Sequence, residues 1–306
     1  MTKARTDLAL VAAFVTVALW ASAFVGIRDA GHHISPGALS LARLVVATLA
    51  LGALVAAKRD AMPARSDLPR VAFVGLLWLG AYNVLLNAAE RHVDAGTAAM
   101  LVNIGPVLIA VLAGVLLKEG FPRSLFAGCA VAFAGVALIG IATSQRGIDS
   151  ATGVLECLGA AVAYSVAVVA QKPLLARTSG LTITFLACAV AMVACLPFAP
   201  ALVHDVGAAP ASAVTWAVYL GLVPTAIGFS TWAYALKRTS AGKMGAFTYL
   251  VPPLAVLLGW LLLSETPPAL ALAGGLLCLA GVAVTRRPAN GSRRIRNAFA
   301  PAARAE

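Results

Sequence analysis

Apolar residues run in long stretches along this chain, separated by short polar connections. Stretches of roughly 20 apolar residues are long enough to cross a bilayer core of about 30 Å as α-helices. The longest internal connection covers about 58–68, so no soluble domain fits between the helices. We predict ten membrane-spanning helices, over about 8–27, 37–57, 69–89, 95–117, 122–142, 151–171, 180–203, 212–236, 241–263 and 268–285.

The composition supports a protein that lies in a lipid bilayer. The chain is 61% hydrophobic and 11% charged, whereas a soluble domain carries about 25% charged residues. Backbone groups in lipid must form hydrogen bonds within their own segment, so the apolar stretches should be helical. The predicted fold class is an all-α membrane protein, and the stretch 288–306 is predicted to be a disordered basic tail.

The second half of the chain repeats part of the first at an offset of 146 residues. Residues 94–137 align with 240–283 without a gap, and 15 of these 44 pairs are identical. The identical glycine, proline and glutamate pairs are Gly96 and Gly242, Pro106 and Pro252, Glu119 and Glu265, Pro122 and Pro268, Gly128 and Gly274, and Gly135 and Gly281. We predict two five-helix units, 1–146 and 147–287. Because five is odd, the second unit should be inverted relative to the first, with a central cavity between them.

The basic residues that give the chain its net charge of +11 lie mostly in the tails and in the connections between the predicted helices. If these connections alternate between two sides of the membrane, 19 of the 23 basic residues fall on the side of both termini. Only Arg28, Arg91 and Arg146 fall on the other side, and Arg43 lies inside a helix. This asymmetry predicts that both termini are on the cytoplasmic side of the inner membrane. The positive charge therefore indicates topology, and no nucleic-acid partner is expected.

Several residues in these helices are typical of one transporter family. Residues 20–24 form the sequence WASAF in the first predicted helix, and Arg43 lies in the second. Ala95 with Gly96, Pro106 and Glu119 mark the fourth helix and its end, and the second half repeats them. The chain resembles the EamA-type members of the drug/metabolite transporter superfamily over nearly its whole length. The resemblance implies a ten-helix fold with an internal cavity, and export of metabolites such as amino acids, or of drugs.

Aromatic and amide side chains in the third predicted helix are the first candidates for solute contacts. Trp78 and Tyr82 are four residues apart and share a helical face, and Asn83 lies about 100° round the helix. An aromatic face beside amides suits a flat or amphipathic solute. Trp20 and Tyr164 are equivalent at an offset of 144 and are further candidates. Packing, or anchoring at the membrane interfaces, would also explain aromatic residues here.

Two prolines in the middle of predicted helices indicate kinks. Pro106 and Pro252 each remove a backbone donor, and kinked helices near the membrane centre are typical of transporter sites. Asn103 and Tyr249 lie three residues before these prolines and are expected to face the cavity. A packing kink without function is the alternative. Two serines complete the polar candidates, Ser22 and Ser230.

Charged residues inside the predicted helices are few. Arg43 and Glu156 both lie in predicted helices, near the same side of the membrane, so they could form a salt bridge. Alternatively, Arg43 extends to the surface, or it receives a substrate carboxylate while Glu156 balances or relays charge. Glu119 and Glu265 each come shortly before a proline that opens the next helix, so we expect them to cap free helix amides.

The sequence thus predicts a solute transporter that works by rocking of two inverted halves. An importer or exchanger of phosphorylated or nucleotide-linked metabolites is the alternative within transport, and it should place several basic residues in the cavity. A membrane-embedded enzyme or a non-transporting scaffold would be different classes. No pattern points to a cofactor or a metal ion. Glycine pairs seven residues apart favour packing within the bundle, so we expect a monomer or a weak homodimer. The solute, the direction of transport and any coupling ion are not predicted.

Overall fold

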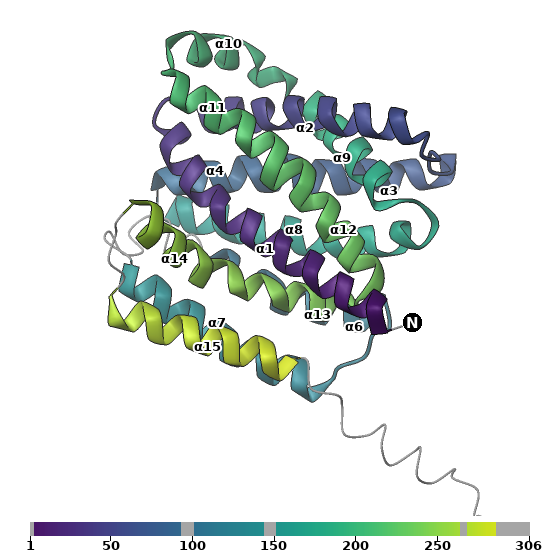
Figure 1. Ribbon diagram of the computed structural model, residues 1–306, viewed down its shortest axis with the longest axis vertical. Helices are drawn as coiled ribbons and strands as arrows, with labels where there is room; N and C mark the ends of the chain where they lie inside the picture. The colour runs from purple at the N-terminus through teal and green to yellow at the C-terminus, as the bar shows by residue number, and fades with distance from the viewer. Residues whose placement is uncertain (1–2, 93–100, 144–150, 264–267, 286–306) are drawn as a thin grey trace, which may run out of the picture.

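The structure is a computed structural model that describes residues 3–92, 101–143, 151–263 and 268–285 (Figure 1). The regular secondary structure of these residues is helical throughout. The first half contains α1 (Lys3–Gly31), α2 (Pro36–Lys58), η1 (Arg65–Asp67), α3 (Leu68–Val74), η2 (Gly75–Tyr82), α4 (Asn83–His92), α6 (Gly105–Leu116) and α7 (Arg123–Thr143). The second half contains α8 (Ala151–Arg177), α9 (Gly180–Ala194), η3 (Leu196–Phe198), α10 (Ala199–Ala208), α11 (Ala211–Leu220), η4 (Gly221–Ile227), α12 (Gly228–Arg238), α13 (Ala241–Phe247), η5 (Thr248–Leu250), α14 (Val251–Leu263) and α15 (Ala269–Thr285).

Six described helical stretches are long and apolar enough to cross a membrane. They are Asp7–Gly31, Pro36–Lys58, Arg65–Ala89, Ala151–Arg177, Ala211–Arg238 and Ala241–Leu258. A seventh is obtained if α9 and the helix after it, bent by 53°, form one span. Three shorter apolar helices are Gly105–Leu116, Arg123–Ile139 and Ala269–Thr285. The all-helical membrane fold is confirmed, while ten crossings stay a prediction.

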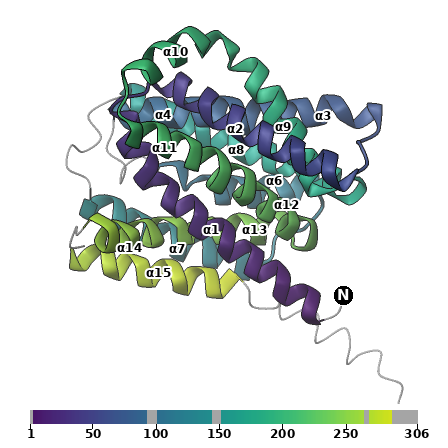
Figure 2. The same cartoon turned by 45° about the horizontal axis from the view of Figure 1, so that its top comes forward.

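The helices of the two halves interleave rather than forming separate bodies. In Figures 1 and 2, α1 runs along one face of the molecule between α11 and α12 on one side and α13 and α14 on the other. From the second half, α8 packs against α3, η2, α4 and α6 of the first half. At one edge of the bundle, α7 and α15 lie side by side.

Glycines bring the backbones of α7 and α15 into direct contact. A Cβ atom added to Gly128 would lie 2.6 Å from the carbonyl oxygen of Gly281, and one added to Gly135 would lie 2.5 Å from that of Gly274. These contacts are reciprocal, because Gly274 and Gly281 are the repeat equivalents of Gly128 and Gly135. The glycine pairs therefore pack within the bundle, as predicted.

Two π-helical segments occur at the same position of the two repeats. Segment η2 begins at Gly75 and η4 begins at Gly221, an offset of 146 residues. Trp78 and Tyr82 belong to η2, and Pro224 lies inside η4, where it offers no backbone N–H to a regular α-helical ladder. Such segments are rare and often mark functional sites.

The helices are interrupted near the two predicted proline kinks. In the first half, a turn at 103–104 precedes α6, whose first turn contains Pro106. In the second half, the short 3₁₀ turn η5 separates α13 from α14, and Pro252 is the second residue of α14. Each proline thus lies in the first turn of a new helix, where its missing N–H is tolerated.

Glu119 caps a helix, but not the one that follows it in sequence. Its Oε1 and Oε2 accept hydrogen bonds from the backbone amides of Ala241, at 2.8 Å, and Gly242, at 3.2 Å. The chain turns sharply after α6, with positive φ at Lys118 and Gly120, and the carboxylate reaches α13 in the other half. The sequence led us to expect that Glu119 caps the helix that follows it, whereas the amides that it contacts belong to α13 of the other half. Glu265 lies outside the described residues.

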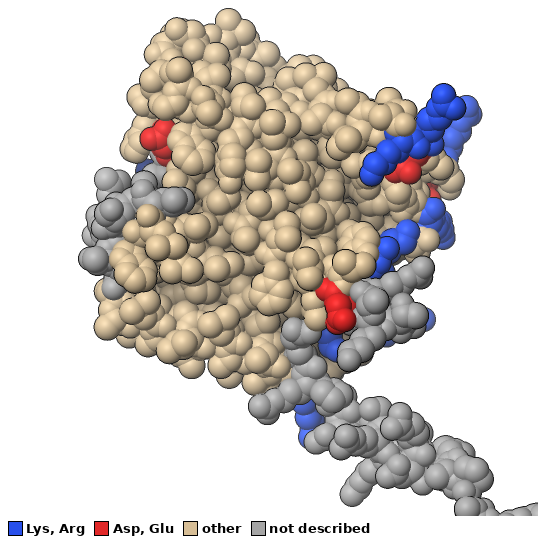
Figure 3. All heavy atoms as spheres, viewed as in Figure 1, with Lys and Arg blue, Asp and Glu red and all other residues tan. Residues whose placement is uncertain are grey.

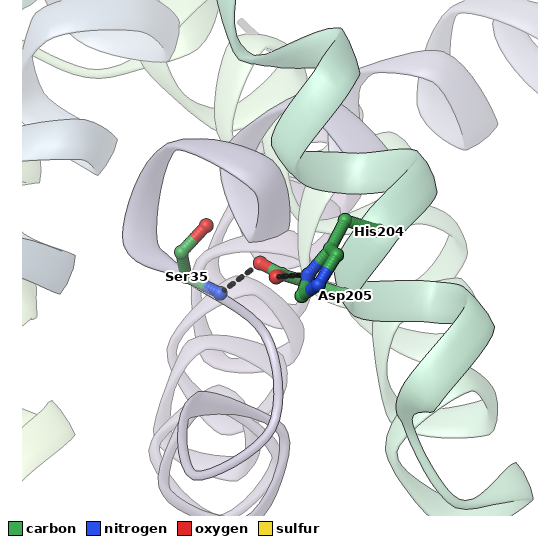
Figure 4. A network of polar contacts seen from close by, with 3 residues as sticks. All are labelled: Ser35, His204 and Asp205. Atoms are coloured by element: carbon green, nitrogen blue, oxygen red, sulfur yellow. Dashed lines mark hydrogen bonds and ion pairs between the residues drawn. The ribbon is translucent and has the colours of Figure 1, made fainter.

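Charged residues gather at the ends of the helices. On the face shown in Figure 3, nearly all visible Lys and Arg lie at the end where the chain begins in Figure 1, and uncharged residues cover the middle. At the opposite end of the helices, Asp205 of α10 accepts a 2.8 Å hydrogen bond from the backbone amide of Ser35, before α2, and lies 3.3 Å from exposed His204 (Figure 4). Polar contacts therefore join the two halves at both ends of the bundle.

Candidate functional site

A cavity of about 90 Å³ lies among helices of both halves. The described residues that line it are Trp20, Ala23, Phe24, Ile27, Arg43, Tyr82, Asn83, Leu86, Val102, Asn103, Pro106, Tyr164, Phe229, Thr248 and Val251. None of these lining residues is acidic, and Arg43 is the one basic residue among them.

Arg43 reaches the cavity from α2 and is 6% exposed, so its side chain does not extend to the surface. Its Nη2 and Nε donate to Oγ1 of Thr225, at 3.2 and 3.4 Å. Glu156, the other predicted charged residue, lies 4.0 Å from Nε2 of His92. The predicted pairing of Arg43 with Glu156 stays a prediction.

Six aromatic rings from four segments form a continuous cluster at the cavity. Trp20 of α1 stacks on Trp232 of α12, with 5.0 Å between ring centroids, and lies 5.2 Å from Phe229. Tyr164 of α8 contacts both η2 rings, at 5.6 Å for Trp78 and 5.8 Å for Tyr82. The Trp20 indole also donates to the carbonyl of Pro224 in η4, at 3.2 Å. These contacts fix the rings that face the cavity.

The polar side chains around the cavity are held by the irregular helical segments. Asn83 donates to the carbonyls of Leu79, at 2.9 Å, and Trp78, at 3.3 Å, within η2. Tyr164 donates to Thr248 of η5 at 3.5 Å. The cavity therefore combines hydroxyl, amide and guanidinium groups with aromatic faces, which is an arrangement suited to a small amphipathic solute.

Among the predicted site residues, Trp20, Arg43, Tyr82, Asn83, Asn103 and Tyr164 line the cavity. Trp78 is 2% exposed and lies behind the lining, against Trp20 and Phe229. Tyr249 is fully buried, and its neighbour Thr248 faces the cavity instead. The roles of all these residues stay predictions.

The remaining predicted residues lie away from the lining. The Ser22 hydroxyl forms a 2.7 Å hydrogen bond with the Tyr219 hydroxyl, and Ser230 of α12 donates to the backbone carbonyl of Ala226, four residues earlier in η4. Glu156 lies on α8 near His92. These contacts connect α1 to α11 and α8 to α4, and they satisfy the Ser230 hydroxyl locally.

Sequence reasoning missed several residues that the structure places at the site. Phe24 and Ile27 follow Trp20 at spacings of four and seven residues, which is the helical signal that could have found them. No comparable signal marks Thr225, which contacts Arg43 across 182 residues. Within the described part of the chain, no three His, Cys, Asp or Glu side chains group closely enough to hold a metal ion.

Comparisons with known proteins support a membrane transporter. A model of the EamA-like transporter family matches residues 7–141 and again residues 151–287. A solved crystal structure superposes with a TM-score of 0.74 over 94% of this chain and 98% of that chain. At 21% identity, this likeness concerns the fold alone.

Relatives cover nearly the whole chain. A "Probable terminal-alkyne amino-acid exporter" from Streptantibioticus cattleyicolor is 43% identical over 94% of this chain and 96% of its own length. The "Uncharacterized transporter YdfC" of Bacillus subtilis is 30% identical over 95% of each chain. A "Probable amino-acid metabolite efflux pump" from Salmonella typhimurium is 26% identical over 88% of this chain and 92% of its own length.

Proposed function

Since the chain belongs to the EamA-like transporter family, we propose that it exports small amino acids with a slim apolar side chain across the inner membrane. One observation carries this proposal: among the described lining residues, Arg43 is the one buried cation, none is acidic, and several are aromatic. The guanidinium would receive the solute carboxylate, and the rings of Trp20, Tyr82 and Tyr164 would receive the ammonium group and the side chain.

The size of the cavity favours a small amino acid over a larger metabolite. A cavity of about 90 Å³ suits an amino acid with a short, slim side chain better than a bulky solute. A phosphorylated or nucleotide-linked metabolite is the second candidate, but it would call for more cations than Arg43 in the described lining. The names of the Streptantibioticus and Salmonella relatives, which refer to amino acids, agree with the first candidate.

Transport would proceed by alternating access of two inverted five-helix halves, 1–146 and 147–287. The reciprocal glycine contacts of α7 and α15 and the repeated π-helical segments support this mechanism, as does a cavity lined from both halves. The basic residues of the connections favour an orientation with both termini in the cytoplasm. We place ten helices in the membrane, although some are short in the described residues.

Flux measurements test the proposal. The purified protein is reconstituted in liposomes loaded with unlabelled solute, and counterflow of L-propargylglycine, L-norvaline, L-phenylalanine, butylamine and glucose 6-phosphate is recorded. We expect counterflow of the two slim amino acids above that of protein-free liposomes. Cells that make the protein should also release preloaded L-propargylglycine faster than cells that make Arg43→Ala. Flux of glucose 6-phosphate without flux of any amino acid would support the alternative instead.

A further inference from the structure

Thr225 lies where the second half of the chain contacts the cavity cation of the first half. It belongs to the π-helical segment η4, directly after Pro224, and is 1% exposed. Its hydroxyl donates to the carbonyl of Leu220, five residues earlier, at 2.6 Å. Because a threonine hydroxyl has one hydrogen, this bond turns the oxygen lone pairs of Thr225 toward other donors.

Those lone pairs accept from the guanidinium of Arg43. Nη2 and Nε of Arg43 lie 3.2 and 3.4 Å from Thr225 Oγ1. The two hydrogen bonds therefore have a fixed direction: the Arg43 guanidinium donates to the Thr225 hydroxyl, and this hydroxyl donates to the Leu220 carbonyl. The contact orients one edge of the guanidinium without neutralising it, because the hydroxyl carries no charge.

A second observation is that a glycine allows η4 to lie unusually close to α2. Gly221, the first residue of η4, faces α2, and a Cβ atom at this position would lie 2.6 Å from Cβ of Val46 and 2.9 Å from the carbonyl oxygen of Arg43. No side chain fits between α2 and η4 at this point. The glycine thus permits the close contact that brings the Thr225 hydroxyl within reach of Arg43.

We infer that Thr225 is a positioning residue that sets solute specificity: it aims the Arg43 guanidinium at the carboxylate of the transported amino acid. This inference rests on the proposed function. Selection of an amino acid over its decarboxylated amine then depends on a hydroxyl from the second half and a cation from the first. Loss of the hydroxyl should weaken carboxylate binding and leave amine binding unchanged.

Binding of L-norvaline and of butylamine, its decarboxylated counterpart, tests the inference. The change in intrinsic tryptophan fluorescence is suitable because Trp20 lines the cavity. Thr225→Val removes the acceptor at nearly constant volume, and Thr225→Ser retains the hydroxyl as the matched control. We expect Thr225→Val to raise the Kd of L-norvaline about tenfold, the typical effect of one hydrogen bond to a charged group. Thr225→Ser should stay within about twofold, and butylamine binding should not change in either variant.

A double-mutant cycle separates positioning from a general structural effect. In an Arg43→Ala background, Thr225→Val should cause no further loss of L-norvaline binding. An equal loss for L-norvaline and butylamine, or a full effect without Arg43, would overturn the inference. If Thr225→Val does not fold, Thr225→Ala gives the same comparison. A wild-type protein that binds no amino acid counts against the proposed function, whereas normal L-norvaline binding by Thr225→Val counts against the inference alone.

Discussion

Removal of the Glu119 carboxylate should loosen the contact between the two halves at the end of the bundle where the chain begins. The side chain accepts from the amides of Ala241, at 2.8 Å, and Gly242, at 3.2 Å. A hydrogen bond to a charged group contributes about 1.5–3 kcal/mol, and the half-buried position of Glu119 favours the lower value. Glu119→Gln retains one oxygen acceptor and should cost about 1.5 kcal/mol, and Glu119→Ala should cost about 3 kcal/mol.

Thermal unfolding in detergent, followed by tryptophan fluorescence, measures this cost. An unfolding entropy of about 2.1 cal/mol/K per residue corresponds to about 0.64 kcal/mol/K for 306 residues. We therefore expect Tm to fall by about 2 °C for Glu119→Gln and about 5 °C for Glu119→Ala. Asp7→Asn is the control, because it removes the same charge from an exposed residue of α1. Melting of both Glu119 variants within 1 °C of this control would refute the reasoning.

Three further predictions concern the cavity and the packing of the bundle. Arg43→Gln should raise the KM of L-norvaline in liposome counterflow at least about tenfold, and unchanged KM would exclude a carboxylate contact. Tyr82→Ala should raise the same KM by about 2- to 30-fold through loss of 0.5–2 kcal/mol of aromatic contact, whereas Tyr82→Phe should retain most of the affinity. Gly281→Ala places a Cβ atom 2.4 Å from the backbone nitrogen of Ala132 and should lower stability by about 1–3 kcal/mol in thermal unfolding. Gly31→Ala, which meets no atom within 4 Å, is its control and should melt like the wild type.

Helix positions could be predicted from the sequence because apolar length is a local property. The helix predicted over 37–57 is observed as α2 (Pro36–Lys58), and the one predicted over 8–27 lies within α1 (Lys3–Gly31). The partner of Glu119 could not be predicted, because it lies 122 residues away and depends on how the halves pack. The π-helical character of η2 was equally hidden, since its residues have the composition of an ordinary apolar helix.

Residues of the candidate site could be predicted from the sequence where a polar side chain lies in a predicted membrane helix. Arg43 and Asn103 stood out as polar residues in apolar surroundings, and both line the cavity. Tyr249 and Thr248 show the limit of such reasoning. The 3₁₀ turn η5 alters the rotation of the chain, so the residue that faces the cavity is one position away from the predicted one.

The glycine contacts between α7 and α15 have a consequence for how the protein could evolve and move. No side chain lies between the two backbones at these points, so α7 and α15 cannot approach each other further when the conformation changes. If the halves rock as proposed, this contact would lie near the rotation axis, and atoms far from it would move most. Substitutions at these glycines would then lower the transport rate of every solute to the same extent. New substrates would arise from changes in the cavity lining, while the contact between α7 and α15 stays the same.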